Sequence, residues 1–232
     1  MRNSSSKFSL IVAIAACASF LTVSSCNDDR CEDDIELGSF QLADETRDFI
    51  PYDGTDVLVF RDQNGNEIGL SSRDGVRQFE YQITTRVLCT GEFEQVNADD
   101  QEEYYRAISF EVLYQSQDGR TSIYVDAVTL GEDDSAAEEV FYDLARAEVV
   151  VDATYSAGLE LVTANREGRP SRDYLESVHN LGRFVGDTIL FGRQYRGVYG
   201  SAFREGTRLF YNASIGVIAI DLPGSQYLVR KQ

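Results

Sequence analysis

The sequence predicts an all-β protein, built as an antiparallel β-sandwich or as a strongly curved, partly closed sheet. Apolar and polar residues alternate with a period of two along most of the chain, which is typical of strands with one buried face. Four Asp-Gly or Asn-Gly pairs punctuate the chain, and such pairs favour the tight turns of hairpins. The chain has 13 tyrosines but only three prolines. Because a sheet with one solvent-exposed face must bury its other, apolar face, we expect either a second layer or closure of the sheet into a barrel-like shape.

The first half of the chain reads as hairpins. Val57 to Phe60 and Ile68 to Leu70 flank the turn signal Asn64-Gly65. A long segment follows in which alternate residues from Phe79 to Cys89 are mostly apolar, as expected of a strand with one dry face. The strands expected in this half are 57–60, 68–70, 79–89, 105–114 and 122–128, the last two joined through Asp118-Gly119.

The middle of the chain has two interpretations. Ser135 is placed to cap a short helix over residues 136–147, and Glu138 would complete a capping box. Three valines, 149–151, follow without a break, so an edge strand remains the alternative. After a loop signal at Gly168 and Pro170, the expected strands are 174–178, 188–191, 195–199, 209–211, 217–220 and 227–229.

The N-terminus has the layout of an export signal. Arg2 and Lys7 precede an uncharged apolar run from Phe8 to Val23, and small residues lead up to Cys26. The run is short and diluted by serine and alanine, whereas a membrane span needs about 20 apolar residues. The alternatives are an ordinary signal peptide cut near Ser25 and an uncleaved anchor helix. We expect a signal peptide over 1–25, an acidic tether over 26–38 and a single β-rich domain over 39–232.

Several segments resemble lipoproteins of the Bacteroidota. Val23-Ser24-Ser25-Cys26 resembles a bacterial lipobox, which implies that Cys26 is acylated and becomes the first residue of the mature protein. The acidic residues that follow resemble the signal for outer-membrane or cell-surface delivery in that group. Phe49-Ile50-Pro51-Tyr52 and the segment 209–218 are similar to patches in its uncharacterised β-rich domains. The resemblance implies a fold and a location, and no activity.

Charge narrows the range of partners. The formal net charge is −18, and removal of Arg2 and Lys7 with the leader would make it −20. Such a surface repels nucleic acid and anionic headgroups, so we expect no nucleic-acid partner and membrane contact only through the lipid anchor. The expected partner is an envelope protein or a glycan that the sequence does not identify.

The cysteines and two hydroxyl residues are candidates for covalent chemistry. Cys31 and Cys89 remain after Cys17 is discarded and Cys26 is acylated, and an oxidising compartment favours a disulfide between them. The alternative is two unpaired thiols. Ser135 and Thr188 lie in acid-hydroxyl-aliphatic triplets that resemble the O-glycosylation pattern of Bacteroidota.

No catalytic residues, metal or cofactor are expected. His179 is the single histidine, and the sequence around Ser177 lacks a nucleophile-elbow motif. The segment Asp62 to Glu67 alternates oxygen side chains as calcium loops do, but its glycine is misplaced and a β-turn explains it better.

These observations favour a non-enzymatic, lipid-anchored cell-envelope protein with a binding or scaffolding role. One alternative is a glycan- or peptide-processing hydrolase that uses a pair of carboxylates. Another is a carrier that holds an apolar ligand between its sheets.

Overall fold

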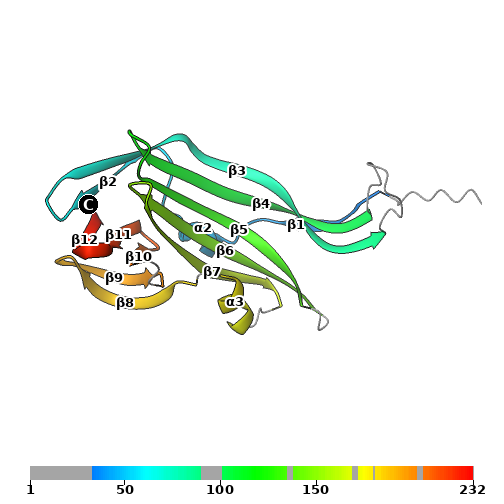
Figure 1. Ribbon diagram of the computed structural model, residues 1–232. Helices are drawn as coiled ribbons and strands as arrows, with labels where there is room; N and C mark the ends of the chain where they lie inside the picture. The colour runs from blue at the N-terminus through cyan, green and yellow to red at the C-terminus, as the bar shows by residue number, and fades with distance from the viewer. Residues whose placement is uncertain are drawn as a thin grey trace, which may run out of the picture.

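The computed structural model describes residues 33–89, 101–134, 138–168, 172–179, 181–202 and 206–231, and it confirms the all-β prediction (Figure 1). One antiparallel sheet curls into a half-barrel. Its strands are β1 (Ile35–Phe40), β2 (Val57–Asp62), β3 (Glu67–Cys89), β4 (Gln101–Ser116), β5 (Ser122–Asp134), β6 (Glu138–Val151), β7 (Tyr155–Glu167), β8 (Arg183–Leu190), β9 (Arg193–Gly200), β10 (Arg208–Asn212), β11 (Gly216–Leu222) and β12 (Gln226–Arg230).

Helical elements are few and short. They are α2 (Asp44–Asp48), α3 (Arg172–Val178) and the 3-10 turn η1 (Pro223–Ser225). Within the described ranges, none of the helices has the length and apolar character needed to span a bilayer.

The strand order shows how the two ends of the chain join. The order is β7-β6-β5-β4-β3-β2-β12-β11-β10-β9-β8, so the last strand, β12, lies between β2 and β11. β1 departs from the antiparallel pattern and runs parallel to β4, from Ile35 beside Glu103 to Phe40 beside Ala107. Residues 35–38 of the expected tether are therefore already paired with the sheet.

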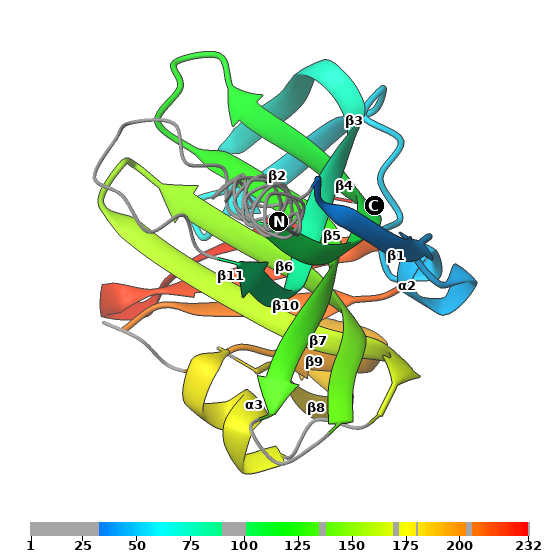
Figure 2. The same ribbon diagram turned by 90° about the vertical axis from the view of Figure 1, so that its right-hand side faces the viewer.

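Curling brings the two ends of the strand order toward each other, as the end-on view in Figure 2 shows. The amide of Gly182, just before β8, donates a 2.8 Å hydrogen bond to the carbonyl oxygen of Glu160 in β7. This bridge joins β7 to the segment that leads into β8, at the side of the curl opposite the pairing of β2 with β12.

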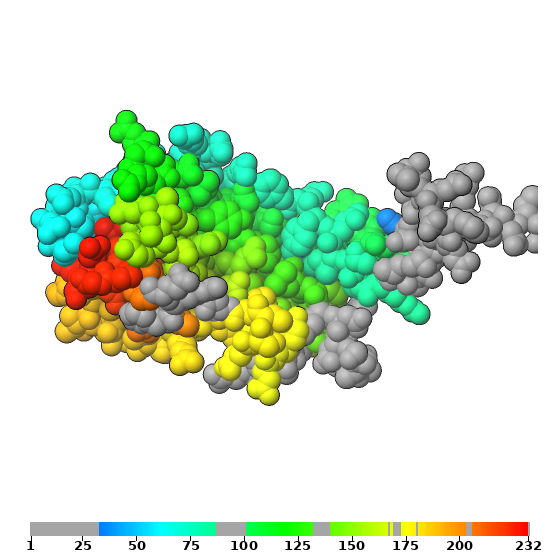
Figure 3. Space-filling model, viewed as in Figure 1, coloured from blue at the N-terminus to red at the C-terminus, as the bar shows by residue number. Residues whose placement is uncertain are grey.

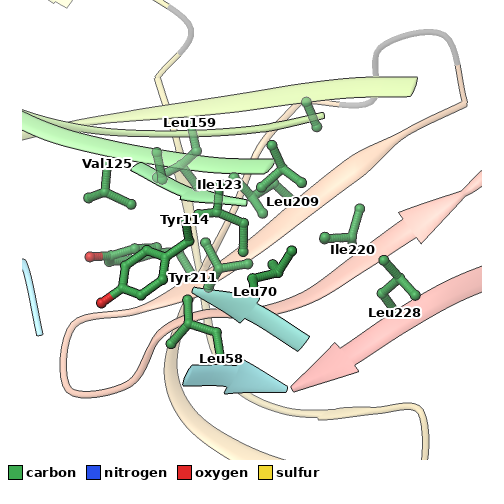
Figure 4. Close-up of a cluster of buried hydrophobic side chains, with 14 of the residues drawn as sticks. Leu58, Leu70, Tyr114, Ile123, Val125, Leu159, Leu209, Tyr211, Ile220 and Leu228 are labelled. Carbon is green, nitrogen blue, oxygen red and sulfur yellow. The ribbon is translucent and has the colours of Figure 1, made fainter. Parts of the chain in front are cut away.

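The main core fills the inside of the curl (Figure 4). Long strands and the C-terminal layer contribute to it together, for example Leu58, Ile123, Leu159, Leu209 and Ile220, each with no more than 1% of its surface exposed. These side chains alternate with outward-facing residues, as a pleated strand requires. Each fully buried aliphatic side chain contributes roughly 1.5–3 kcal/mol through removal from water, so this cluster is the main source of stability.

Two distant sequence patches meet at one place in this core. The hydroxyl oxygen of Tyr52 accepts a 2.6 Å hydrogen bond from the amide of Val217, and the Tyr211 hydroxyl donates to the carbonyl oxygen of Phe49. Gly216, at φ +86°, lies directly against the Tyr52 ring. The segments 49–52 and 209–218 are thus the two sides of one contact.

A buried carboxylate fixes α2 inside the half-barrel. Asp143 has no exposed surface, and its oxygens accept hydrogen bonds from the amide of Ala43 and the hydroxyls of Thr46 and Thr129. Arg166 adds an ion pair at 3.0 Å. Buried charge is tolerated only when it is paired and hydrogen-bonded in this way.

Of the two interpretations of the middle segment, the strand is correct and the helix over 136–147 is wrong. Residues 138–151 form strand β6, which lies inside the sheet and not at its edge, because it pairs with β5 on one side and β7 on the other. Residues 172–178 form helix α3, where a strand was expected, and Leu175 packs on the outer face of β6. The expected strands at 68–70 and 79–89 are one continuous strand, β3, interrupted by a register shift between Ser72 and Val76.

Candidate functional site

His179 sits in a hydrogen-bonded relay on the outer face of the long strands. Its Nδ1 lies 3.2 Å from Glu160 Oε2 and its Nε2 lies 2.8 Å from the hydroxyl of Tyr142. The imidazole also packs edge-on against the Tyr142 ring, with ring centroids 5.9 Å apart. Both ring nitrogens therefore have partners.

Ser177, two residues before His179 in the sequence, does not join this relay. Ser177 Oγ donates a 2.7 Å hydrogen bond to the carbonyl oxygen of Tyr174 within α3. A nucleophilic serine would instead have to hydrogen-bond the imidazole that activates it. His179 lines a hollow of about 840 Å³ between α3 and β8, whose other lining residues include Glu176, Arg183 and Phe184. The contacts of His179 connect the end of α3 to β6 and β7, so they account for this histidine as a structural residue.

A second hollow of about 350 Å³ lies over β5, β6 and β7. Arg146 meets Asp126 there through two nitrogens, with Nε 2.8 and 3.1 Å from the two carboxylate oxygens. The Tyr124 hydroxyl reaches Glu111 at 3.1 Å and Asp126 at 3.4 Å. Burial, followed by the negative charge of Asp126, raises the pKa of Tyr124 above its ordinary value. The arginine in this hollow is thus neutralised by an adjacent carboxylate.

A third hollow, of about 180 Å³, is lined mainly by basic residues. Asp62 also lines it, but the Asp62 carboxylate is hydrogen-bonded within the β2–β3 turn. Arg61 on β2 and Lys231 after β12 share one carboxylate, Glu67, at 2.7 and 2.9 Å. Arg193 at the start of β9 donates to the carbonyl oxygen of Arg230 at 3.2 Å. We name Arg61, Arg193 and Lys231 the basic triad.

The electrostatics of the basic triad are unbalanced. The hydrogen bond from Arg61, and then that from Lys231, lowers the pKa of Glu67, so this carboxylate is ionised at neutral pH. One carboxylate serves two cations, and the structure pairs Arg193 with no carboxylate among the described residues. This hollow therefore carries local positive charge on a protein whose formal net charge is −18.

An aromatic pair forms one wall of the same hollow. Phe191 and Tyr227 stack with ring centroids 4.1 Å apart and an interplanar angle of 21°. Phe191 occupies the β8–β9 turn at φ +50°, followed by Gly192 at φ +81°. A bulky residue in this left-handed region is strained, and backbone strain gathers at functional sites. The turn holds an aromatic ring beside the cations at a cost in backbone energy.

The residues expected to be modified are placed only in part. Cys26, Cys31 and Ser135 lie outside the described residues, whereas Thr188 is half-buried in β8. Cys89 is the last residue of β3 and pairs in register with Gln101. The Gln101 side chain donates to the carbonyl oxygen of Asp33 at 3.2 Å, so the chain two residues after Cys31 lies beside this strand pair. The disulfide and the glycosylation sites stay predictions.

The acidic turn at Asp62 is explained by its own hydrogen bonds. Asp62 Oδ1 accepts from the amides of Asn64 and Asn66, both at 2.8 Å, and Oδ2 accepts from the Asn66 side chain at 2.9 Å. These bonds occupy the oxygens that a cation would need. Across the described ranges there is no group of three or more His, Cys, Asp or Glu side chains that could hold a metal.

The sequence did not predict the basic triad. Its members lie on three separate elements, and Arg61 and Lys231 are 170 positions apart. Each one alone is an ordinary surface charge. The only available signal was that Lys231 is the single lysine outside the leader.

Comparison with known proteins adds no assignment to this geometry. No protein-family model, curated protein or solved structure matches the chain.

Proposed function

We propose that this chain is a lipid-anchored cell-envelope protein, acylated at Cys26, whose β domain has a non-enzymatic binding role. The lipobox-like segment and the acidic residues after it support the anchor. Because one acyl chain binds a bilayer only reversibly, stable anchoring requires more than one chain, which the lipobox resemblance implies.

The position of β1 supports this proposal best. β1 begins at Ile35 beside Glu103, close to where β3 ends and β4 begins. The β2–β3 turn, the β8–β9 turn and the C-terminus lie at the opposite end of the molecule (Figure 1). A domain tethered through β1 would thus hold its turn-rich end, which includes the basic triad, away from the membrane.

The packing favours binding on the outside over the carrier alternative. Twenty buried residues form a continuous cluster inside the curl, including the large rings of Tyr52, Tyr114 and Tyr211. An apolar ligand would have to displace these side chains, and removing large core side chains costs about 2–5 kcal/mol each.

The hydrolase alternative would use the carboxylates of the hollow over β5–β7. Glu148 and Glu160 both line it, and they are diagonal neighbours on adjacent strands. Glu160 is hydrogen-bonded to His179, however. This hydrogen bond holds the Glu160 carboxylate in position, which favours a structural role over that of a general acid.

Metabolic labelling tests the anchor. We expect the full-length protein, made in bacteria that process lipoproteins and fed an alkyne fatty acid, to incorporate the label and fractionate with membranes. Cys26→Ser should lose the label. Cys17→Ser is the matched control, because it removes a cysteine from the same leader and should keep the label. An unlabelled wild-type protein would overturn the proposal.

A tag tests presentation at the surface. The turn at Asn64 and Gly65 is exposed, and an added Cβ at Gly65 meets no atom within 4 Å, so an epitope inserted there should be tolerated. Antibody binding to intact cells would support surface display. Binding only after the outer membrane is opened would place the domain in the periplasm.

A further inference from the structure

The basic triad and the Phe191–Tyr227 stack line the same hollow at one end of the molecule. Figure 3 shows the β2–β3 turn, β12 and the β8–β9 hairpin gathered at that end. The hollow between them, at about 180 Å³, has the volume of about six water molecules. It is large enough for one charged group on a single ring.

The chemistry of the lining selects the ligand. Guanidinium and ammonium groups bind oxyanions, and a guanidinium presents a planar fork of donors to a carboxylate or phosphate. Phe191 keeps 37% of its surface exposed while one side rests on Tyr227. The Phe191 ring can stack on a planar ring of a ligand while the cations of the basic triad bind an oxyanion on that ring.

The negative charge of the rest of the protein distinguishes this hollow from the other parts of the surface as a site for an anion. An acidic protein repels anions at long range, and charges more than about 8–10 Å from a site are largely screened at physiological salt. A local excess of cations favours an anion. The two hollows described above lack such an excess, because Arg146 is neutralised by Asp126 in one and Arg183 shares the other with Glu176. In the basic hollow, four basic residues outnumber the one lining carboxylate, Asp62, among the described residues.

We propose that the basic triad, together with the Phe191–Tyr227 stack, is a binding site for an oxyanion carried on a ring. Arg193 and Lys231 contact the oxyanion, and Phe191 contacts the ring. Glu67 competes with the ligand, since it occupies Arg61 and Lys231 in the empty protein. This inference goes beyond the proposed anchor and does not depend on it.

Calorimetric titration at low ionic strength tests the site. The full-length protein in a nonionic detergent is titrated with phenyl phosphate, benzoate, inorganic phosphate and phenol, with detergent alone as the blank. We expect at least one of the two ring oxyanions to bind more tightly than inorganic phosphate and phenol. The tighter of phenyl phosphate and benzoate identifies the anionic group. Absence of binding by both would overturn the proposal.

Variants locate the binding on the protein. Arg193→Gln and Lys231→Gln should each weaken it about two- to fivefold, the range expected for one exposed charge pair. Arg120→Gln is the matched control, because it removes an equal charge from an exposed arginine that pairs with Asp152 at 3.6 Å elsewhere. Equal weakening by all three variants would show general electrostatics and would overturn the site.

One variant should improve binding. Glu67→Gln releases Arg61 and Lys231 from their internal partner, so we expect the affinity to rise about two- to fivefold. Misfolding cannot produce a gain of affinity, which makes this result informative even if another variant is unstable. Weaker binding by Glu67→Gln would refute the competition that the geometry implies.

Discussion

Gly216→Ala should be one of the most destabilising single-methyl changes available in this protein. Gly216 has φ +86°, and an added Cβ would stand 2.1 Å from the hydroxyl oxygen and 2.2 Å from Cζ of Tyr52. Real Cβ contacts are never this short, so the Tyr52 ring has to move. The ring has little room, because Tyr114 packs 5.5 Å away, centroid to centroid, and the guanidinium of Arg230 lies 5.7 Å from the ring centre.

The expected loss has three parts. A left-handed backbone costs a residue with a Cβ roughly 1–2 kcal/mol. Overpacking of a filled core costs about 1–3 kcal/mol. Displacement of Tyr52 also breaks the hydrogen bond from the Val217 amide, worth about 1 kcal/mol. We therefore expect the free energy of unfolding to fall by about 3–6 kcal/mol.

Urea denaturation followed by circular dichroism measures this loss, and Gly65→Ala is the control. Gly65 has nearly the same backbone, φ +88°, but nothing within 4 Å of an added Cβ. Its substitution should cost only the backbone part, about 1–2 kcal/mol. In a double-mutant cycle, Tyr52→Ala should cost less in the Gly216→Ala background than in the wild type. Equal losses for the two glycine variants would refute the argument that the contact with Tyr52 matters.

Two further predictions concern stability, and a third concerns the disulfide. Asp143→Ala should lower the free energy of unfolding by about 3–5 kcal/mol, because it leaves Arg166 without its buried partner; Asp48→Ala, at an exposed position, should change it by less than about 0.5 kcal/mol. Burial raises the pKa of Tyr52 to about 12, so the stability that this phenol contributes is complete below pH 10 and is lost as the pH rises from 10 to 12; a Tyr52→Phe variant should show a shallower alkaline decline in melting temperature. Peptide mapping without reduction should recover Cys31 linked to Cys89; recovery of both as free thiols would contradict the disulfide.

Turn chemistry made part of the fold predictable. Asn64-Gly65 joins β2 to β3 and Asp118-Gly119 joins β4 to β5, as expected, because both glycines take the positive φ that these turns require. The short C-terminal strands were also identified correctly. Such signals are local, so a single sequence is enough to detect them.

Strand β6 was ambiguous because both of its faces are buried. Phe141 faces the inside of the curl and Tyr142 faces outward, and each has no more than 2% of its surface exposed. A strand covered on both faces loses the alternation that distinguishes it from a helix. Its pairing with β5 and β7 decides its conformation, and that pairing is not visible from the segment alone.

The basic triad was unpredictable for a topological reason. Arg61 and Val229 are register partners in the pairing of β2 with β12, which places Lys231 near Arg61 although the chain between them is almost the whole domain. No local pattern records that β12 returns to the first hairpin. The contact of Tyr52 with Val217 has the same origin, since it also joins the N-terminal segment to the C-terminal layer.

The last strand therefore completes the fold and the proposed site together. Until β12 lies between β11 and β2, Lys231 is not beside Arg61 and Tyr227 is not under Phe191. Only the folded state has the site, so a ligand must stabilise the folded state by an amount that grows with the logarithm of its concentration, about 1.4 kcal/mol at ten times its dissociation constant. A ring oxyanion that raises the midpoint of urea unfolding in the wild type, and raises it further in Glu67→Gln, would tie the binding site to the strand that closes the structure.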